Sequence, residues 1–246
     1  MKRTVKELKL IAKEMGLKGY SKLNKVELVE LIEGAQTATT KEEERGETSK
    51  KIEFKPQDTA IPNGNSKSAE YLVGDIWLND CILDYGCGKG RNIKYIKESV
   101  NCNIYVDGCD IQEQLDKEYD LHRELEIDGN TTITLAEDLM NDQYDKILNS
   151  HVLNVVESDD MKNFIIKDIY SKLRDGGQAY FEVRTQKDIE KSTSKIKYGN
   201  GWWMPTKNTY QEAISEEKMI SLLANNGFKI VKHICNQSKH IAICEK

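Results

Sequence analysis

The stretch Ile82-Leu83-Asp84-Tyr85-Gly86-Cys87-Gly88-Lys89-Gly90-Arg91 determines the fold expected for this chain. It begins with apolar residues typical of a buried strand, passes through three glycines at alternate positions, and leads into an amphipathic helix over residues 91–99. Glycine has no Cβ and adopts positive φ, so such a loop turns tightly and lets a ligand approach the backbone. The N–H groups at the start of the helix also face that ligand. An ordinary strand-to-helix turn of an α/β domain is the alternative explanation.

The spacing of the glycines distinguishes between nucleotide cofactors. A dinucleotide site expects G-x-G-x-x-G, whereas here Gly90 comes one residue early and Arg91 occupies the position of the third glycine. With Asp84 ahead of Gly86, the pattern D-x-G-x-G-x-G resembles motif I of class I S-adenosylmethionine (SAM) dependent methyltransferases. The resemblance implies SAM as the cofactor, with Asp84, Gly86, Gly88 and Gly90 beside its methionine and ribose part.

Length and composition favour a cytoplasmic protein without a membrane segment or a metal. The 246 residues suffice for one good-sized domain and a small one, and 31% of them are charged. No run approaches the roughly 18 apolar residues that a membrane helix needs, and the first residues lack the apolar core of a secretory signal. The six cysteines include no Cys-x-x-Cys pair, so neither a zinc site nor a disulfide framework is expected.

The first 34 residues indicate a small helical module. Thr4 with Glu7 predicts the capped start of a helix over residues 4–15, and Asn24 with Glu27 predicts a second, short helix. Two helices joined by an extended Gly-Tyr-Ser-Lys-Leu loop resemble the SAP and Rho N-terminal modules, which implies nucleic acid as a partner. The segment holds eight Lys and Arg against five Asp and Glu, although the whole chain carries a net charge of -5. The candidate phosphate contacts are Lys2, Arg3, Lys18, Lys22 and Lys25.

Two points about this module stay open. A solvated helical pair used for protein contacts or oligomerisation explains the same pattern, and the oligomeric state does not follow from the sequence. Residues 35–51 contain no apolar side chain larger than alanine and many charges, so they are expected to form a flexible linker. The predicted domains are therefore the module at 1–34, the linker at 35–51 and a catalytic domain at 52–246.

Strand and helix patterns alternate after residue 66. This alternation predicts an α/β fold with a Rossmann-like, seven-stranded, mostly parallel methyltransferase sheet, to which the small all-α N-terminal domain is added. Ligands of such sheets bind at the carboxyl ends of the strands. Helices are expected over residues 66–78, 91–99, 112–124, 158–174 and 214–226. Strands are expected over residues 81–85, 103–109, 131–136, 144–150, 178–184, 228–235 and 239–244.

Acidic residues follow the second and third predicted strands. Asp110 lies about twenty residues after the glycine loop, where a carboxylate accepts both hydroxyls of a ribose. By the methyltransferase resemblance Asp138 meets the adenine ring, and Ile111 and Leu139 complete the cofactor contacts. An Asp at the end of a strand is also a common helix cap, which is the alternative for Asp138.

The fourth predicted strand leads to the candidate catalytic residues. Its tip faces the transferred methyl group in this fold, and His151 is the histidine nearest to it. An imidazole there can act as the base that accepts the acceptor's proton, although a lone histidine is more often structural. Asn149 and Asn154 could orient an amine, with Asn149 also near the cofactor. Arg184 could bind a phosphate or carboxylate, or form a structural ion pair.

A wider set of segments resembles the DNA phosphorothioation-associated methyltransferases of bacteria and phages. The resemblance spans roughly residues 54–230 and departs from that family at Arg91-Asn92 and Ile111. Neither the Pro-Pro-aromatic motif of amine methylation nor a Pro-Cys nucleophile is present. The matching segments are Asp58-Thr59-Ala60-Ile61, the glycine loop, Asn149-Ser150-His151-Val152-Leu153-Asn154-Val155-Val156, Tyr180-Phe181-Glu182-Val183-Arg184 and Pro205-Thr206-Lys207-Asn208-Thr209-Tyr210-Gln211.

The sequence therefore predicts a SAM-dependent methyltransferase tethered to DNA or RNA by its N-terminal module. Two other functions remain open. The first is methylation of a small molecule or a protein, which the acidic balance of the catalytic domain favours. The second is a non-catalytic SAM-binding regulator, which the missing amine-methylation motif permits. Trp202 and Trp203, in the insert over residues 185–210, either stack on a base, close as a lid, or pack within the insert.

Overall fold

The computed structural model describes residues 4–5, 24–29, 52–59, 64–191 and 195–246. The chain divides into two compact units, Met1–Ile52 and Glu53–Lys246, each considered by itself. In the first unit, Asn24 Oδ1 accepts hydrogen bonds from the N–H groups of Val26 and Glu27 at 2.9 and 3.2 Å. Glu27 Oε2 accepts in return from the Asn24 N–H at 2.8 Å, which confirms the predicted capping box. Most of the helix predicted over 4–15, the linker 35–51 and all the basic candidates except Lys25 lie outside the described residues.

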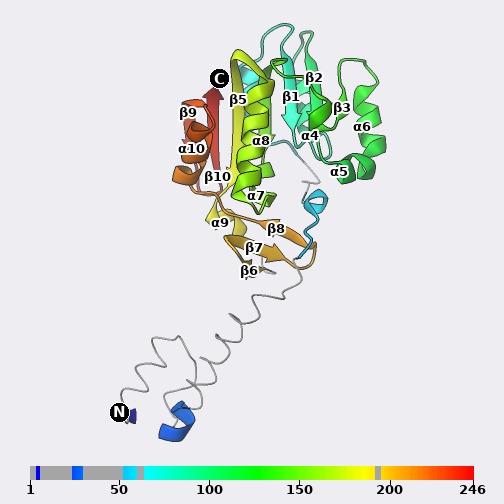
Figure 1. The fold of residues 1–246 in the computed structure, drawn as a ribbon. Helices are drawn as coiled ribbons and strands as arrows, with labels where there is room; N and C mark the ends of the chain where they lie inside the picture. Colours follow the sequence, from blue (N-terminus) through cyan, green and yellow to red (C-terminus); the bar gives the residue numbers. More distant parts are fainter. Residues whose placement is uncertain (1–3, 6–23, 30–51, 60–63, 192–194) are drawn as a thin grey trace. The chain divides into compact units, whose positions relative to one another are not determined.

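The second unit is built on a seven-stranded sheet with the order β3-β2-β1-β4-β5-β10-β9 (Figure 1). The first five strands run parallel, whereas β10 pairs antiparallel with both β5 and β9. The predicted seven-stranded, mostly parallel sheet is thereby confirmed. Its strands are β1 (Cys81–Tyr85), β2 (Tyr105–Cys109), β3 (Ile133–Thr134), β4 (Tyr144–Ser150), β5 (Leu173–Arg184), β9 (Lys229–Cys235) and β10 (Lys239–Glu245).

Helices cover both faces of this sheet. Successive strand residues point to opposite faces, so Ile82 packs with α3 and α4, whereas Leu83 packs with α8 and α10. Both residues are fully buried. Among the described residues, no helix is both long and apolar enough to cross a bilayer. The helices are α3 (Lys67–Gly74), α4 (Arg91–Ser99), α5 (Gln112–Lys117), α6 (Tyr119–Glu126), α7 (Val152–Val155), α8 (Asp159–Lys172), α9 (Gln186–Ile189) and α10 (Glu216–Asn225), with short 3-10 turns η3 (Pro56–Asp58) and η4 (Ala136–Asp138).

Two element boundaries differ from the sequence prediction. The helix expected over 112–124 is interrupted at Glu118, a buried residue whose carboxylate lies 3.7 Å from the Lys89 ammonium beside the glycine loop. The fifth strand begins at Leu173, because Gly176 and Gly177 form an irregularity inside the strand instead of ending the preceding helix. Neither the burial of Glu118 nor this shift in register is visible in local periodicity.

The insert after β5 contains a second, three-stranded sheet that the sequence did not predict. Its strands β6 (Ile196–Tyr198), β7 (Gly201–Met204) and β8 (Thr209–Gln211) are antiparallel. The arm at 52–59 packs against it, since the Phe54 ring contacts the rings of Tyr198 and Tyr210 at 5.2 and 5.5 Å between centroids. The arm and the small sheet together lie beyond the carboxyl end of the parallel strands (Figure 1).

Candidate functional site

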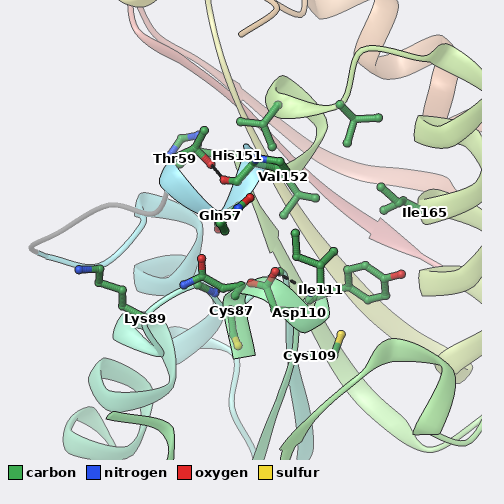
Figure 2. Close-up of a pocket in the computed structure, with 18 of the residues that line it drawn as sticks. Gln57, Thr59, Cys87, Lys89, Cys109, Asp110, Ile111, His151, Val152 and Ile165 are labelled. Carbon is green, nitrogen blue, oxygen red and sulfur yellow. Dashed lines mark hydrogen bonds between the residues drawn. The ribbon is translucent and has the colours of Figure 1, made fainter. Parts of the chain in front are cut away.

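A cavity of about 610 Å³ opens at the carboxyl ends of β1, β2 and β4. The glycine loop after β1, Asp110 and Ile111 after β2, and His151 after β4 line it, as Figure 2 shows. The arm contributes Gln57 and Thr59 from the opposite side. A volume of this size suits a ligand as large as a nucleoside with a substituent. The cavity therefore lies where the alternating strand and helix pattern predicted a ligand.

The glycine loop approaches the cavity because its backbone adopts conformations that other residues disfavour. Gly86 has φ of 81°, and a Cβ at this position would lie 2.2 Å from the Val152 side chain. Gly88, with φ of 54°, donates its N–H to Asp110 Oδ2 at 2.7 Å. Gly90 has another role, since a Cβ there would meet Leu125 of α6 and the residue does not line the cavity. Two of the three predicted glycines thus face the cavity.

Asp84 lies below the loop, fully buried at the end of β1. Burial raises the pKa of its carboxyl group to about 7, although a hydrogen bond from Asn92 acts in the opposite direction. The Asn92 amide, which lines the cavity, donates to Asp84 Oδ1 at 3.4 Å, while Asp84 Oδ2 has no protein partner. Asp84 therefore reaches the cavity through Asn92 and not directly.

Asp110 is held with its carboxylate at the cavity. Its Oδ1 accepts from the N–H of Ile111 at 2.8 Å, in addition to the Gly88 contact on Oδ2. Burial raises the pKa of Asp110, and these two backbone hydrogen bonds oppose the rise. Gln114, one turn into α5, also lines the cavity, and its side chain is 99% buried with neither Oε1 nor Nε2 hydrogen-bonded. Such an orphaned buried amide is costly unless a ligand pairs with it.

The third strand does not supply the predicted contacts. Asp138 is exposed in η4, its Oδ2 accepts from the Thr134 hydroxyl at 3.0 Å, and it does not line the cavity. Leu139 packs toward the core and is likewise outside the lining. Ala136, two residues earlier, lines the cavity instead. The short β3 is followed by the 3-10 turn η4, whose first residue, Ala136, lines the cavity, whereas Asp138 at its end does not.

His151 lies at the tip of β4 in a group of ionisable side chains that is centred on Glu182. It caps α7 in a left-handed conformation, with φ of 65°. Its Nε2 lies 3.2 Å from Oε1 of Glu182, a fully buried carboxylate that also pairs with the Lys239 ammonium at 2.5 Å. Burial alone would raise the pKa of Glu182, but His151 and Lys239 hold it at about 2. The carboxylate is therefore ionised and favours a proton on Nε2, which leaves Nδ1 as an acceptor.

The two asparagines predicted to be catalytic are structural in this arrangement. The amide nitrogen of Asn154 donates to the carbonyls of Arg184 and Glu212 at 3.2 and 2.6 Å, and its oxygen accepts from the Arg184 N–H at 2.8 Å. Asn149 donates to the Tyr85 carbonyl at 3.2 Å. Both are buried and neither lines the cavity. They join β4 and α7 to neighbouring segments. Asn154 uses both its amide nitrogen and its oxygen in these bonds, whereas Asn149 Oδ1 is buried without a hydrogen-bond partner.

Arg184 lines the cavity with its guanidinium held from two sides. Its Nε donates to Asp188 Oδ2 at 2.6 Å and its Nη1 to Gln211 Oε1 at 3.1 Å. A guanidinium held in this way retains further donors for an anionic ligand. Trp202 and Trp203 do not line the cavity, because Lys195 and Lys197 lie over the Trp202 ring and Trp203 donates to Asn208 at 3.0 Å. The two tryptophans pack within the insert.

Unpartnered polar atoms test whether SAM fits this cavity. Three lining residues carry a buried polar atom without a protein partner, namely Arg91 at Nε, Gln114 at both amide atoms and His151 at Nδ1. An adenosine with a charged amino-acid tail offers both hydrogen-bond donors and acceptors to these atoms. The glycine loop and Ile111 offer backbone and apolar surface to the rest of such a ligand. The residues present therefore fit SAM.

Sequence reasoning missed three contributors to the site. Glu182 stands alone as an acid within the apolar run Tyr180-Phe181-Glu182-Val183, a signal that marks a buried charge and was available. Gln114 gave no signal, because a polar residue on a short helix is ordinarily exposed. Lys239 lies 88 residues after His151 in the sequence. The pairing of β10 with β5 brings it near Glu182, the residue that His151 contacts.

Comparison with protein families gives two matches. The model described as a methyltransferase domain matches residues 39–233. The model described as the Rho termination factor, N-terminal domain, matches residues 2–39. No curated protein matches the sequence.

Solved structures share the fold at low identity. An S-adenosylmethionine dependent methyltransferase from Mesorhizobium loti is 15% identical with a TM-score of 0.54, and the alignment covers 73% of this chain and 98% of that one. The Burkholderia thailandensis 1,6-didemethyltoxoflavin-N1-methyltransferase, solved with its substrate and S-adenosylhomocysteine, is 15% identical with a TM-score of 0.56 and 86% of each chain covered. A SAM-dependent methyltransferase from Methanosarcina mazei is 17% identical with a TM-score of 0.54, covering 72% and 96%.

Proposed function

This chain belongs to the methyltransferase domain family and uses S-adenosylmethionine as its methyl donor, and from that premise we propose that it methylates a nucleic acid. The observation that carries the proposal is the cavity at the strand ends, whose lining includes buried polar atoms without partners. The acceptor assignment is supported by the Rho N-terminal match over residues 2–39.

We assign the cofactor contacts residue by residue. Gly86 and Gly88 give backbone contact to the ligand, and Asp110 accepts from the ribose hydroxyls. Ile111 and Ala136 supply apolar surface for the adenine, while Gln114 pairs with a polar edge of the nucleoside. Bound in this way, the cofactor supplies an electrophilic methyl group. Asp84 and Gly90 act indirectly, through Asn92 and through the packing of α6.

His151 is the proposed base. The ionised Glu182 carboxylate holds the proton on Nε2, so Nδ1 can accept a proton from an amine or hydroxyl of the acceptor. Lys239 keeps Glu182 ionised. Arg184, held by Asp188 and Gln211, can bind an acceptor phosphate. Positioning of the acceptor in line with the methyl group supplies the rest of the rate.

The segments that resemble phosphorothioation-associated methyltransferases support a DNA substrate within the nucleic-acid class. Four of them contribute a residue to the cavity lining, through Thr59, His151, Arg184 and Gln211, besides the glycine loop. The arm residue Asp58 pairs with Lys117 of α5 at 2.6 Å, so this side of the cavity is held in place. A base presented singly to this cavity has to leave the duplex stack.

Methylation of a small molecule is the second candidate. One observation favours it: the arm lines one side of the cavity with four apolar or neutral residues (Phe54, Pro56, Gln57 and Thr59), and Gln211 of β8 also lines the cavity. The 1,6-didemethyltoxoflavin-N1-methyltransferase named above is named for a small-molecule acceptor. Under this alternative the N-terminal module serves for localisation.

One experiment separates the two candidates. The full chain is incubated with labelled SAM and with DNA, RNA or a small-molecule extract, and nucleosides are analysed by mass spectrometry. We expect label in a nucleoside, and turnover lowered by about 10²- to 10⁴-fold in His151→Asn with S-adenosylhomocysteine affinity retained. Label confined to the small-molecule fraction would overturn the nucleic-acid assignment. An unchanged rate and pH profile in His151→Asn would overturn its role as the base.

The domain organisation is part of the same proposal. Residues 1–34 act as the binding module, residues 35–51 as the linker and residues 52–246 as the catalytic domain. The separation of the chain at Ile52 into two compact units supports it. A linker of about 17 residues would raise the local concentration of nucleic acid at the catalytic domain without forming a fixed groove.

A further inference from the structure

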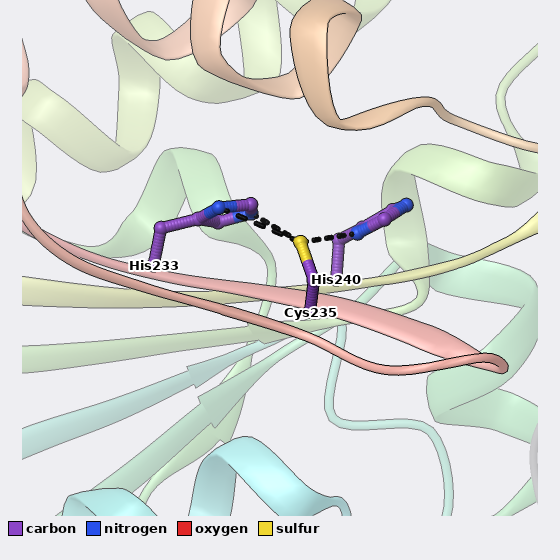
Figure 3. A group of neighbouring side chains, drawn as sticks. All are labelled: His233, Cys235 and His240. Atoms are coloured by element: carbon purple, nitrogen blue, oxygen red, sulfur yellow. Dashed lines mark hydrogen bonds between the residues drawn. The ribbon is translucent and has the colours of Figure 1, made fainter.

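Three side chains of types that bind metals gather on the β9–β10 hairpin (Figure 3). None of the three lines the cavity described above. His233 and Cys235 lie on β9, two residues apart, and Cys235 pairs across the hairpin with His240 of β10. Residues two apart on one strand, and residues paired across two strands, share a face of the sheet. Helix α10 covers this face of the sheet. Glu216, the first residue of α10, contacts His233.

The donor atoms are as close as the ligands of a single ion. The Cys235 Sγ lies 3.0 Å from His240 Nδ1 and 3.5 Å from either ring nitrogen of His233. Glu216 places Oε1 3.0 Å from His233 Nδ1 and Oε2 3.2 Å from Cys235 Sγ. Around tetrahedral zinc, with bonds of about 2.0 to 2.3 Å, donor atoms lie roughly 3.3 to 3.6 Å apart. The ligand atoms of His233, Cys235 and His240 all lie within 4.8 Å of one another, and Glu216 contacts two of these three residues.

We propose that His233, Cys235 and His240, with Glu216 as the fourth ligand, form a zinc site. One thiolate and two imidazoles form a donor set that binds zinc in preference to magnesium or calcium, because those two ions take oxygen ligands. On binding, a sulfur–zinc bond replaces the S–H bond of Cys235, and the proton passes to solvent. This site was not predicted from the sequence, because its spacing is His-x-Cys-x4-His and not a pair of Cys-x-x-Cys motifs.

The hairpin turn holds the ligands before any ion binds. Asn236 Oδ1 accepts from the N–H groups of Ser238 and Lys239, both at 2.9 Å. The turn is fastened to the end of β5, since the Thr185 N–H donates to the Ser238 carbonyl at 3.1 Å. Lys239, the partner of Glu182, lies next to the ligand His240. A zinc ion would therefore brace the strand end that supports the proposed base.

Metal analysis of the untagged full chain tests the site. We expect one zinc ion per chain after gel filtration, and a thiolate-to-cobalt charge-transfer band when Co²⁺ replaces it. Cys235→Ser and His240→Ala should each lose the band and the bound zinc. Cys102→Ser, which changes a partly buried cysteine outside the cluster, should retain both.

Two further measurements keep the test decisive. S-adenosylhomocysteine affinity and the circular dichroism spectrum show whether each variant is folded. Zinc should raise the melting temperature of the wild type and of Cys102→Ser, but not of Cys235→Ser. Wild type that retains no zinc after gel filtration and gains no band with Co²⁺ overturns the proposal, as does equal zinc retention in folded Cys235→Ser.

Discussion

Buried polar atoms without protein partners define the site at the scale of single residues. Gln114, Arg91 and His151 each line the cavity with such an atom. Native proteins pair the great majority of their buried polar groups, because an unpaired one costs about 1 to 3 kcal/mol. The unpaired atoms are therefore best explained by a ligand, and they lead to predictions in which stability and affinity change in opposite directions.

Gln114→Leu is expected to weaken S-adenosylhomocysteine binding while leaving the free protein as stable or more stable. Leucine fills a similar volume and removes two buried polar atoms that have no partner in the free protein. The lost contact should cost about 1 to 3 kcal/mol of binding free energy. Calorimetry measures the affinity and urea unfolding the stability. A variant with wild-type affinity would show that the glutamine faces no ligand.

Asp84→Asn is expected to remove a pH dependence of SAM affinity. Burial raises the pKa of Asp84 to about 7, so the carboxyl is protonated in the free protein below that pH. A cationic ligand favours the ionised form, so affinity should rise with pH, by up to about tenfold per unit, until it levels above pH 7. The stability of the free protein should change with pH in the opposite direction. The pKa of Asp84 is higher in the folded state, at about 7, than its ordinary value of 3.8, so its contribution to stability is fully present below about pH 4 and is lost as the pH rises through 7. Equal slopes in wild type and variant, measured by calorimetry from pH 5.5 to 8.5, would contradict the coupling.

At the scale of elements, the glycine loop and the start of α7 form one packed unit. Gly86 has positive φ, and a Cβ there would lie 2.2 Å from the Val152 side chain, the first residue of α7. His151 caps the same short helix. The loop proposed to contact the cofactor and the helix capped by the proposed base therefore hold each other in position.

Gly86→Ala is expected to destabilise the catalytic domain more than Gly129→Ala. Both glycines have positive φ, at 81° and 74°, so both variants bear a backbone cost of about 1 to 2 kcal/mol. Only at Gly86 does the new methyl group overlap a neighbour, which should add about 1 to 3 kcal/mol, since nothing lies within 4 Å at Gly129. Urea unfolding measures the difference. Equal losses in the two variants would mean that Val152 moves away at no cost.

At the scale of the whole molecule, charge is divided between a basic N-terminal segment and an acidic remainder. Residues 1–34 hold three more basic than acidic side chains, within a chain of net charge -5. The match to the Rho N-terminal domain lies over this basic segment. Attraction to phosphates is then confined to one end of the chain and should depend on salt.

Reversing charge at Lys18, Lys22 and Lys25 to Glu is expected to weaken binding to long DNA or RNA and leave S-adenosylhomocysteine affinity unchanged. Losing three cations should lower the salt slope of the binding constant by about 2 to 3 units. A matched variant with Lys94, Lys187 and Lys229 changed to Glu on the catalytic unit serves as the control. Fluorescence anisotropy at several salt concentrations measures both. Equal effects of the two variants would favour a protein-contact role for the module.

The sequence by itself determined the architecture and the class of cofactor. Strand and helix patterning is local, and the D-x-G-x-G-x-G motif at Asp84–Gly90 is contiguous, so both can be read along the chain. Six of the seven sheet strands were predicted within one residue at their carboxyl ends, and the short β3 ends two residues earlier than predicted. The carboxyl ends matter most, because they position Asp110 and His151 at the cavity.

Only the tertiary structure decided which side chains face the cavity and which hold the framework. Asn154 and His151 lie three residues apart in the sequence. The Asn154 amide is hydrogen-bonded to the backbone, whereas His151 lines the cavity. Lys239 meets Glu182 only because β10 pairs with β5. Such contacts join residues that are distant in sequence. A buried polar group must also find a hydrogen-bond partner, and a local sequence pattern does not show which groups are buried or which partners are near.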